Sequence, residues 1–301
     1  MVDEKSFAII IPAHNEESSI RMTLDKVLKH YADKAEIIVI NDGSTDNTPA
    51  IVSEYPGIKC ITHKRQYGYG AALKSGITST DRDIVCFIDA DGQHNSEDIQ
   101  KLVDNVGEAD MVVGSRGGRA YLNLIRAPGK YVIRIISNYL VGQKIPDLNS
   151  GLRAIKRNVI LRYIHLLPDG FSASSTMTMI LLMKRYEVNF IPIKTQKRIG
   201  KSEVKQLQDG LGTIVLLIRI IMLFNPLKIF LPFSIFSFSF GILYGIYKLV
   251  TIDGHGLSVG SLLIMLLGLF SFIIGLLADQ ISTLRQDYRE GVDAIKRFRK
   301  G

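Results

Sequence analysis

The stretch Ile84–His94 reads IVCFIDADGQH and joins an apolar run to a polar turn. The run Ile84–Ile88 predicts a buried strand, and Asp89 and Asp91 follow it with a spacing that lets both carboxylates face one side. Hard divalent cations prefer oxygen ligands and often keep phosphate oxygens in their shell. Asp89 and Asp91 therefore suit a divalent metal such as Mg²⁺ bound to a diphosphate, and Gln93 could add a carbonyl oxygen. Taken alone, the motif also fits a polar turn that caps a helix.

Short β-type runs alternate with helical runs around this stretch. We expect strands at 7–11, 36–40, 58–62, 84–88 and 111–113, and helices at 18–31, 49–55, 69–79 and 95–106. This alternation predicts an α/β fold with a Rossmann-like, mostly parallel sheet covered on both faces. Cys60 and Cys86 lie inside two of the strands, so we expect both thiols to be buried.

Three further motifs follow predicted strands or open a predicted helix. They are PAHNE at 12–16, NDGSTD at 41–46 and GYGA at 68–71. Ligands of parallel α/β sheets bind at the carboxyl ends of the strands, so one ligand could reach all of these segments. Each motif has a plainer interpretation as turn chemistry, helix capping or close packing at a helix start.

The C-terminal part is strongly apolar. Segments 229–250 and 258–278 are each long enough to cross a hydrocarbon core of about 30 Å, and we expect two transmembrane helices there. The flanks 197–205 and 285–300 are rich in Lys and Arg, whereas the connector 251–257 has neither. The positive-inside rule then predicts that the N-terminal α/β domain and the C-terminal tail lie on the cytoplasmic side.

The net charge of +8 arises largely near these apolar segments, which favours a membrane surface over nucleic acid. We predict a cytoplasmic domain at 1–204, an amphipathic interface helix at 205–225, two membrane helices within 226–279, and a basic tail helix at 280–301. Segment 130–141 is also amphipathic and fits either a core helix or an interfacial one. The tail could bind lipid or another subunit, so homo-oligomer formation stays open.

The motifs PAHNE, NDGSTD, GYGAA and DADGQH together resemble the family 2 inverting glycosyltransferases of GT-A fold. The resemblance continues at GSR (114–116), NSGLR (149–153) and KRIGKS (197–202), which look like the branch containing dolichyl-phosphate mannose synthase and bacterial polyprenyl-phosphate glycosyltransferases. It covers the whole chain, including the paired membrane helices. It implies a metal-dependent enzyme that transfers a sugar from a nucleotide-sugar to a polyprenyl or dolichyl phosphate.

Carried over by matching position, the resemblance also implies the site residues. The nucleotide-sugar would contact Pro12, Ala13, His14, Asn15, Glu16, Asn41, Asp42, Gly70, Asp89, Ala90 and Asp91. Asp89, Asp91 and Gln93 would hold Mg²⁺ or Mn²⁺ on the diphosphate, and the acceptor phosphate would contact Arg116, Ser150, Arg153, Arg198 and Ser202. Asp147 lies near the acceptor motif in the sequence and could orient Arg153. The catalytic set would be Asp89, Asp91, Arg116, Arg153 and Arg198. Asn41 stands where many members carry Asp, and segment 171–176 lacks an acid that related sequences often carry, which leaves the donor sugar open.

A phosphate acceptor explains why no catalytic base is needed, because a phosphate monoester is mostly dianionic at neutral pH. We favour UDP-glucose or another UDP-hexose as donor, with GDP-mannose as the alternative. A processive polysaccharide synthase is disfavoured because its Q-x-x-R-W motif needs a Trp and this chain has none. A non-catalytic membrane scaffold or sensor is the alternative from another class.

Overall fold

The computed structural model describes residues 6–116, 138–139, 142, 144–170, 172–196, 218, 221–251 and 258–298, and only the backbone of 286–298. The chain divides into two compact units, Met1–Leu216 and Leu217–Gly301. The predicted segments 130–141, 197–205 and 205–225 lie wholly or mostly outside the described residues, as do Arg198 and Ser202.

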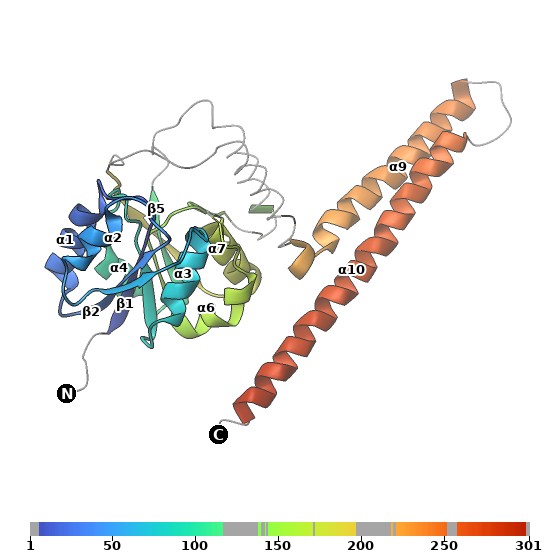
Figure 1. Ribbon diagram of the computed structural model, residues 1–301. Helices are drawn as coiled ribbons and strands as arrows, with labels where there is room; N and C mark the ends of the chain where they lie inside the picture. Colours follow the sequence, from blue (N-terminus) through green and yellow to red (C-terminus); the bar gives the residue numbers. More distant parts are fainter. Residues whose placement is uncertain are drawn as a thin grey trace. The chain divides into compact units, whose positions relative to one another are not determined.

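The first unit is built on a seven-stranded sheet with helices on both faces (Figure 1). The strands are β1 (Phe7–Ala13), β2 (Ala35–Asn41), β3 (Lys59–Thr62), β4 (Ile84–Phe87), β5 (Met111–Arg116), β6 (Arg153–Lys156) and β7 (Val188–Ile193). Their order is β3-β2-β1-β4-β6-β5-β7. Strands β1 to β4 run parallel, and β5 runs parallel to β7. The mostly parallel sheet expected from the sequence is confirmed.

Strand β6 differs from this expectation, because it runs antiparallel between β4 and β5. Cys86 pairs with Ala154, and Val112 pairs with the same alanine from the other side. The insertion brings the residues just before β6 to the carboxyl end of β4. Residues 149–152 therefore lie beside the DADGQH turn.

The helices of this unit are α1 (Ile20–Tyr31), α2 (Thr48–Ser53), α3 (Tyr69–Thr78), α4 (Glu97–Asn105), α6 (Arg157–Tyr163) and α7 (Ala173–Met183), with a short 3₁₀ helix at Ile164–Leu166. Helix α1 buries residues at helical spacing, which gives it one apolar face. That face packs with α4 against alternate residues of β1 and β2. The opposite face of β1 meets α3, where Ile10 lies against Gly76 so closely that a side chain would not fit.

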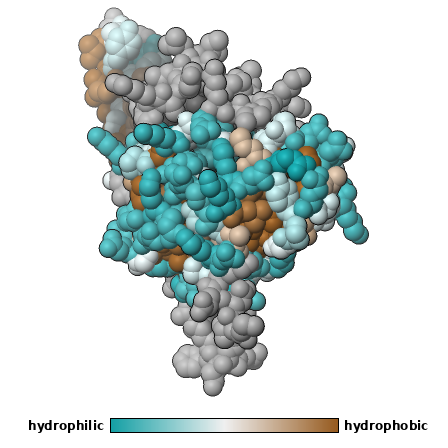
Figure 2. All heavy atoms as spheres, turned by 90° about the vertical axis from the view of Figure 1, so that its left-hand side faces the viewer, coloured by the Kyte–Doolittle hydropathy of each residue, from teal (hydrophilic) through white to brown (hydrophobic). Residues whose placement is uncertain are grey.

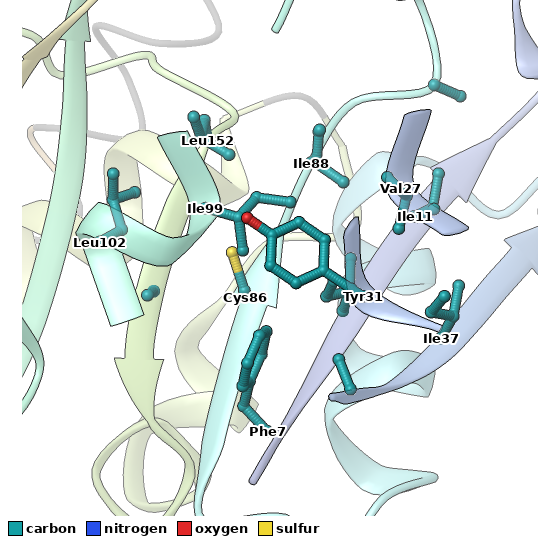
Figure 3. Packing of buried hydrophobic residues seen from close by; sticks show 14 of the residues in the cluster. Phe7, Ile11, Val27, Tyr31, Ile37, Cys86, Ile88, Ile99, Leu102 and Leu152 are labelled. Atoms are coloured by element: carbon teal, nitrogen blue, oxygen red, sulfur yellow. The ribbon is translucent and has the colours of Figure 1, made fainter. Parts of the chain in front are cut away.

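Among the residues drawn in Figure 3 from the core between α1, α4 and the sheet, Tyr31 carries a hydroxyl group. Tyr31 packs edge-on against Phe7, and its hydroxyl donates to the carbonyl of Ser96 at 2.8 Å. The backbone N–H of Gln100 donates to the same hydroxyl. These bonds satisfy a buried polar group and tie α1 to the segment after the DADGQH turn.

Cys86 is buried as expected, whereas Cys60 is exposed. The prediction was wrong for Cys60 because β3 is the edge strand of the sheet and pairs only with β2 in the described structure. An apolar run in the sequence does not distinguish an edge strand from a central one.

The face of the molecule drawn in Figure 2 is mainly hydrophilic at its surface.

The second unit contains helices α9 (Leu227–Thr251) and α10 (Val259–Phe298), which pack against each other. Both have segments long and apolar enough to cross a membrane, Leu227–Thr251 and Val259–Arg285. Small residues of α9 are buried at a spacing of three or four positions, namely Ser234, Ser237, Gly241 and Gly245. Most of the large apolar side chains that the structure describes on these two helices are exposed, including Phe236 and Leu243. The predicted tail helix continues α10 without a break as far as Phe298.

Candidate active site

A pocket of about 320 Å³ lies at the carboxyl ends of the parallel strands. The predicted nucleotide-sugar residues that line it are Pro12, Ala13, His14, Asn15, Glu16, Asp42, Asp89, Ala90 and Asp91. The lining also contains Gln66, Gly68, Tyr69, Ala72, Asn149, Gly151, Gly170 and Ser174, which the sequence analysis did not assign to the site. Three separate strand ends thus contribute to one pocket.

The turns after β1 and β2 are hydrogen-bonded to each other. Asn15 adopts a positive φ of 52°, and its side-chain oxygen accepts from the backbone N–H of Thr45 at 2.8 Å. The backbone N–H of Asn15 donates to the hydroxyl of Ser44, and the N–H of Glu16 donates to the hydroxyl of Thr48. Asn and Asp tolerate the left-handed conformation better than other side chains, which suits Asn15 to this turn.

Asp42 is almost completely buried at one end of the pocket. Its carboxylate accepts from the backbone N–H groups of Tyr67 at 2.9 Å and Gly68 at 2.7 Å. The ring Nδ1 of His63 lies 2.6 Å from the same carboxylate, and its Nε2 lies 2.8 Å from the hydroxyl of Ser75. These contacts fix Asp42 to the segment that leads into α3.

Asn41 and Gly70 do not line the pocket. The side chain of Asn41 is buried and accepts from the backbone N–H of Ser44, so it supports the turn that carries Asp42. The N–H of Gly70 donates to the carbonyl of Asp169, and a side chain at Gly70 would collide with the carbonyl of Pro168. Asn41 therefore supports the site through its side chain, and Gly70 through its backbone.

Asp89 and Asp91 both line the pocket, and 29% of the Asp89 side chain is exposed. The hydroxyl of Tyr69 donates to Oδ1 of Asp89 at 3.1 Å, and Nε2 of His94 lies 3.6 Å from Oδ2. Burial alone would raise the pKa of Asp89, but the contacts with His94, Tyr69 and Arg116 outweigh it and lower the pKa. Asp89 is therefore ionised at neutral pH.

The carboxylate oxygens of Asp89 and Asp91 fit a hard divalent cation that the substrate also helps to bind. The described residues contain no group of three His, Cys, Asp or Glu side chains that could hold a metal by themselves. Two carboxylates facing a pocket instead suit Mg²⁺ or Mn²⁺, which complete their shell with phosphate oxygens and waters. Gln93 does not line the pocket, and its backbone N–H donates to Oδ1 of Asp91 at 3.1 Å.

Arg116 forms a two-pronged ion pair with Asp147. Its Nε lies 2.8 Å from Oδ2 of Asp147 and its terminal nitrogen lies 3.0 Å from Oδ1. Burial alone would raise the pKa of Asp147, but the hydrogen bonds and charge of Arg116 outweigh it and lower the pKa. The sequence placed Asp147 near the acceptor motif, where it could orient Arg153; in the structure its carboxylate pairs with Arg116.

Arg153 is fully buried and lies behind the pocket wall. Its guanidinium donates to the carbonyl of Ser174 at 2.7 Å, to the hydroxyl of Thr178 at 3.1 Å and to the carbonyl of Ser150. The predicted contact with an acceptor phosphate would require the guanidinium to leave these bonds. Ser150 is also fully buried, and its hydroxyl has no hydrogen-bond partner among the described atoms.

The family model for glycosyl transferase family 2 matches residues 8–163, and a model for the GtrB C-terminal hairpin matches residues 225–284. A relative from Proteus mirabilis, undecaprenyl-phosphate 4-deoxy-4-formamido-L-arabinose transferase, is 30% identical over 51% of this chain and 49% of its own length. The chain thus aligns with about half the length of that relative. Dolichyl-phosphate hexose transferase from Haloferax volcanii is 27% identical over 67% of this chain and 88% of its own length.

The fold also resembles solved structures of GT-A type. One is glucosyl-3-phosphoglycerate synthase from Mycobacterium tuberculosis in complex with Mn²⁺, UDP-glucose and phosphoglyceric acid. Its TM-score is 0.57 at 21% identity, and the match covers 72% of this chain and 79% of that chain. The match to the family model extends over more than half of the residues and includes the strand ends that form the pocket. This chain therefore belongs to glycosyl transferase family 2.

Proposed function

We propose that the protein transfers a hexose from a UDP-sugar to a polyprenyl phosphate in the membrane, with inversion at the anomeric carbon. The observation that carries this proposal is the pocket in which Asp89 and Asp91 meet the turns after β1 and β2. Relatives named as undecaprenyl-phosphate and dolichyl-phosphate transferases support the acceptor class. The apolar helix pair supports an acceptor whose hydrocarbon tail stays in the bilayer.

In this proposal, one group of pocket residues binds the nucleoside and another binds the cation. Asp42 and the turn 12–16 bind the nucleoside, while Asp89 and Asp91 hold the divalent cation on the diphosphate. That cation, when bound, balances the negative charge that develops on the departing nucleoside diphosphate. The acceptor phosphate is already a nucleophile, so the protein has only to orient it and balance its charge.

The hydrogen bonds of Asp42 favour uridine over guanosine. An ionised carboxylate has about four lone-pair positions, and His63, Tyr67 and Gly68 already occupy three of them. One position remains, which suits the single N–H of a uracil ring. Guanine presents adjacent N–H groups that a carboxylate binds with both oxygens. GDP-mannose therefore remains the less favoured donor.

Arg116 is the described arginine best placed to act on the acceptor side. Its guanidinium is partly exposed, with 31% of the side chain accessible, and Asp147 fixes its orientation. Arg198 and Ser202 complete the proposed acceptor set. Arg153 and Ser150 would contribute from behind the pocket wall. We place the catalytic unit and the tail on the cytoplasmic side, as the distribution of Lys and Arg indicates.

The test is transfer of radiolabel from UDP-[¹⁴C]glucose and GDP-[¹⁴C]mannose into polyprenyl phosphate, with the purified full-length protein in detergent. We expect lipid-soluble label from the UDP-sugar, and its loss with EDTA and in Asp91→Ala. Asp33→Ala removes an exposed acid outside the pocket and serves as the matched control. Label from GDP-mannose alone would reverse the donor assignment. Absence of label with any nucleotide-sugar would favour a non-catalytic scaffold.

A further inference from the structure

Both carboxylate oxygens of Asp89 face side chains to which the sequence analysis assigned no role in the site. The hydroxyl of Tyr69 donates to Oδ1 at 3.1 Å. The ring of His94 is almost completely buried, and its Nε2 lies 3.6 Å from Oδ2. Nδ1 of His94 has no hydrogen-bond partner among the described atoms, whereas Nε2 faces Asp89.

A third neighbour closes the carboxylate from another side. A Cβ atom on Gly151 would lie only 2.0 Å from Oδ2 of Asp89, so the backbone of the 149–152 segment packs directly against the carboxylate. The direction that remains open leads into the pocket, where Asp89 is partly exposed. The carboxylate is thus held in one orientation before any ligand arrives.

Backbone hydrogen bonds of the residues before and after Tyr69 fix its position. The backbone N–H of Gly68 donates to Asp42, while the N–H groups of Gly70 and Ala71 donate to the carbonyl of Asp169. Gly68 has a φ of 110°, a conformation that side chains rarely adopt. The tyrosine therefore begins α3 in a defined place.

We propose that Tyr69 is a positioning residue that holds the carboxylate of Asp89 in the orientation needed to bind the cation, and that His94 supports the other oxygen. This inference rests on the proposed function, because it takes Asp89 to be a ligand of the cation. Groups that hydrogen-bond to metal-binding carboxylates orient them, and their removal typically weakens metal binding by about 10- to 100-fold. Tyr69 would act on the cation through the carboxylate of Asp89, to which its hydroxyl donates.

The experiment compares Tyr69→Phe with Tyr55→Phe in the full-length protein. Each substitution removes one tyrosine hydroxyl that donates to an aspartate, but the bond from Tyr55 to Asp25 lies outside the pocket. Binding of Mn²⁺ is measured in the presence of saturating UDP, from the electron paramagnetic resonance signal of free Mn²⁺. Thermal unfolding without ligands is measured on the same samples.

We expect Tyr69→Phe to weaken Mn²⁺ binding by about tenfold, with little change in thermal unfolding, and Tyr55→Phe to leave Mn²⁺ binding unchanged. Unchanged or tighter binding in Tyr69→Phe would overturn the inference, because the hydroxyl would then be either irrelevant or a competitor of the cation. If Tyr69→Phe does not fold, His94→Gln decides by the same criterion. A wild-type protein that binds no Mn²⁺ with UDP would instead reject the proposed function, and with it this inference.

Discussion

Replacement of Gly151 by Ala should displace Asp89 without disturbing the rest of the fold. The new Cβ would lie 2.0 Å from Oδ2 and 2.4 Å from Cγ of Asp89, whereas ordinary contacts begin at 3.4 Å. The carboxylate must therefore retreat by about 1.4 Å at Oδ2. Gly151 does not have a positive φ, so alanine is compatible with its backbone.

A displacement of this size is large on the scale of catalysis. A misplacement of about 1 Å near reacting groups can reduce the rate by about 100-fold, which corresponds to about 2.7 kcal/mol of lost transition-state stabilisation. The Asp89 side chain can move toward the open pocket, so we expect the stability of the protein to change much less than its turnover.

The assay is sugar transfer to polyprenyl phosphate over a range of Mn²⁺ concentrations, with thermal unfolding measured in parallel. Gly107→Ala is the matched control, because a Cβ at that position meets no atom within 4 Å. We expect Gly151→Ala to lose about 100-fold in kcat/KM and Gly107→Ala to behave as wild type. Turnover of Gly151→Ala within about twofold of wild type would refute the reasoning, since Asp89 would then not need its observed position.

Three other predictions concern groups around the pocket. Arg153→Lys should lower the free energy of unfolding by about 3 kcal/mol, because an ammonium group cannot reproduce the buried fork of hydrogen bonds; chemical denaturation measures this, and a loss below about 1 kcal/mol would contradict it. Arg116→Met should cost about 2 kcal/mol at pH 7. The stability that comes from the lowered pKa of Asp147 is present above the unfolded-state pKa and is lost as Asp147 becomes protonated. The difference in stability from wild type should therefore shrink as the pH falls below about 4. A difference in stability that does not depend on pH would argue against the ion pair. His63→Gln should raise KM for the UDP-sugar about fivefold with little change in kcat, because Asp42 loses one support; an effect on kcat alone would place His63 elsewhere in the reaction.

The first half of the fold could be predicted because its signals are local. The strands β1, β2 and β4 are short apolar runs, and each is followed by a turn whose polar residues reach one pocket. Pattern alone locates such elements, and the rule for parallel sheets then brings their ends together. This is why Asp42, Asp89 and Asp91 were found in one pocket.

The second half depends on contacts between distant residues. Strand β6 has four residues, and nothing in its sequence shows that it runs antiparallel between β4 and β5. That placement brings Gly151 to Asp89 and leaves Arg116, not Arg153, opposite Asp147. Tyr69 was visible in the GYG motif, but only its distance to Asp89 indicates a role.

Strand β6 connects the two parts of the sheet, because it lies between β4 and β5. In the described part of the chain, the ladder of backbone bonds reaches β5 and β7 solely through this four-residue strand. A nascent chain synthesised only as far as residue 116 would thus contain strands β1 to β4 and their turns. It would lack β6, the strand through which β5 pairs with the rest of the sheet. Amide hydrogens of β5 and β7 should consequently become protected together with those of β6 and after those of β1 and β2, which pulsed hydrogen exchange during refolding can resolve.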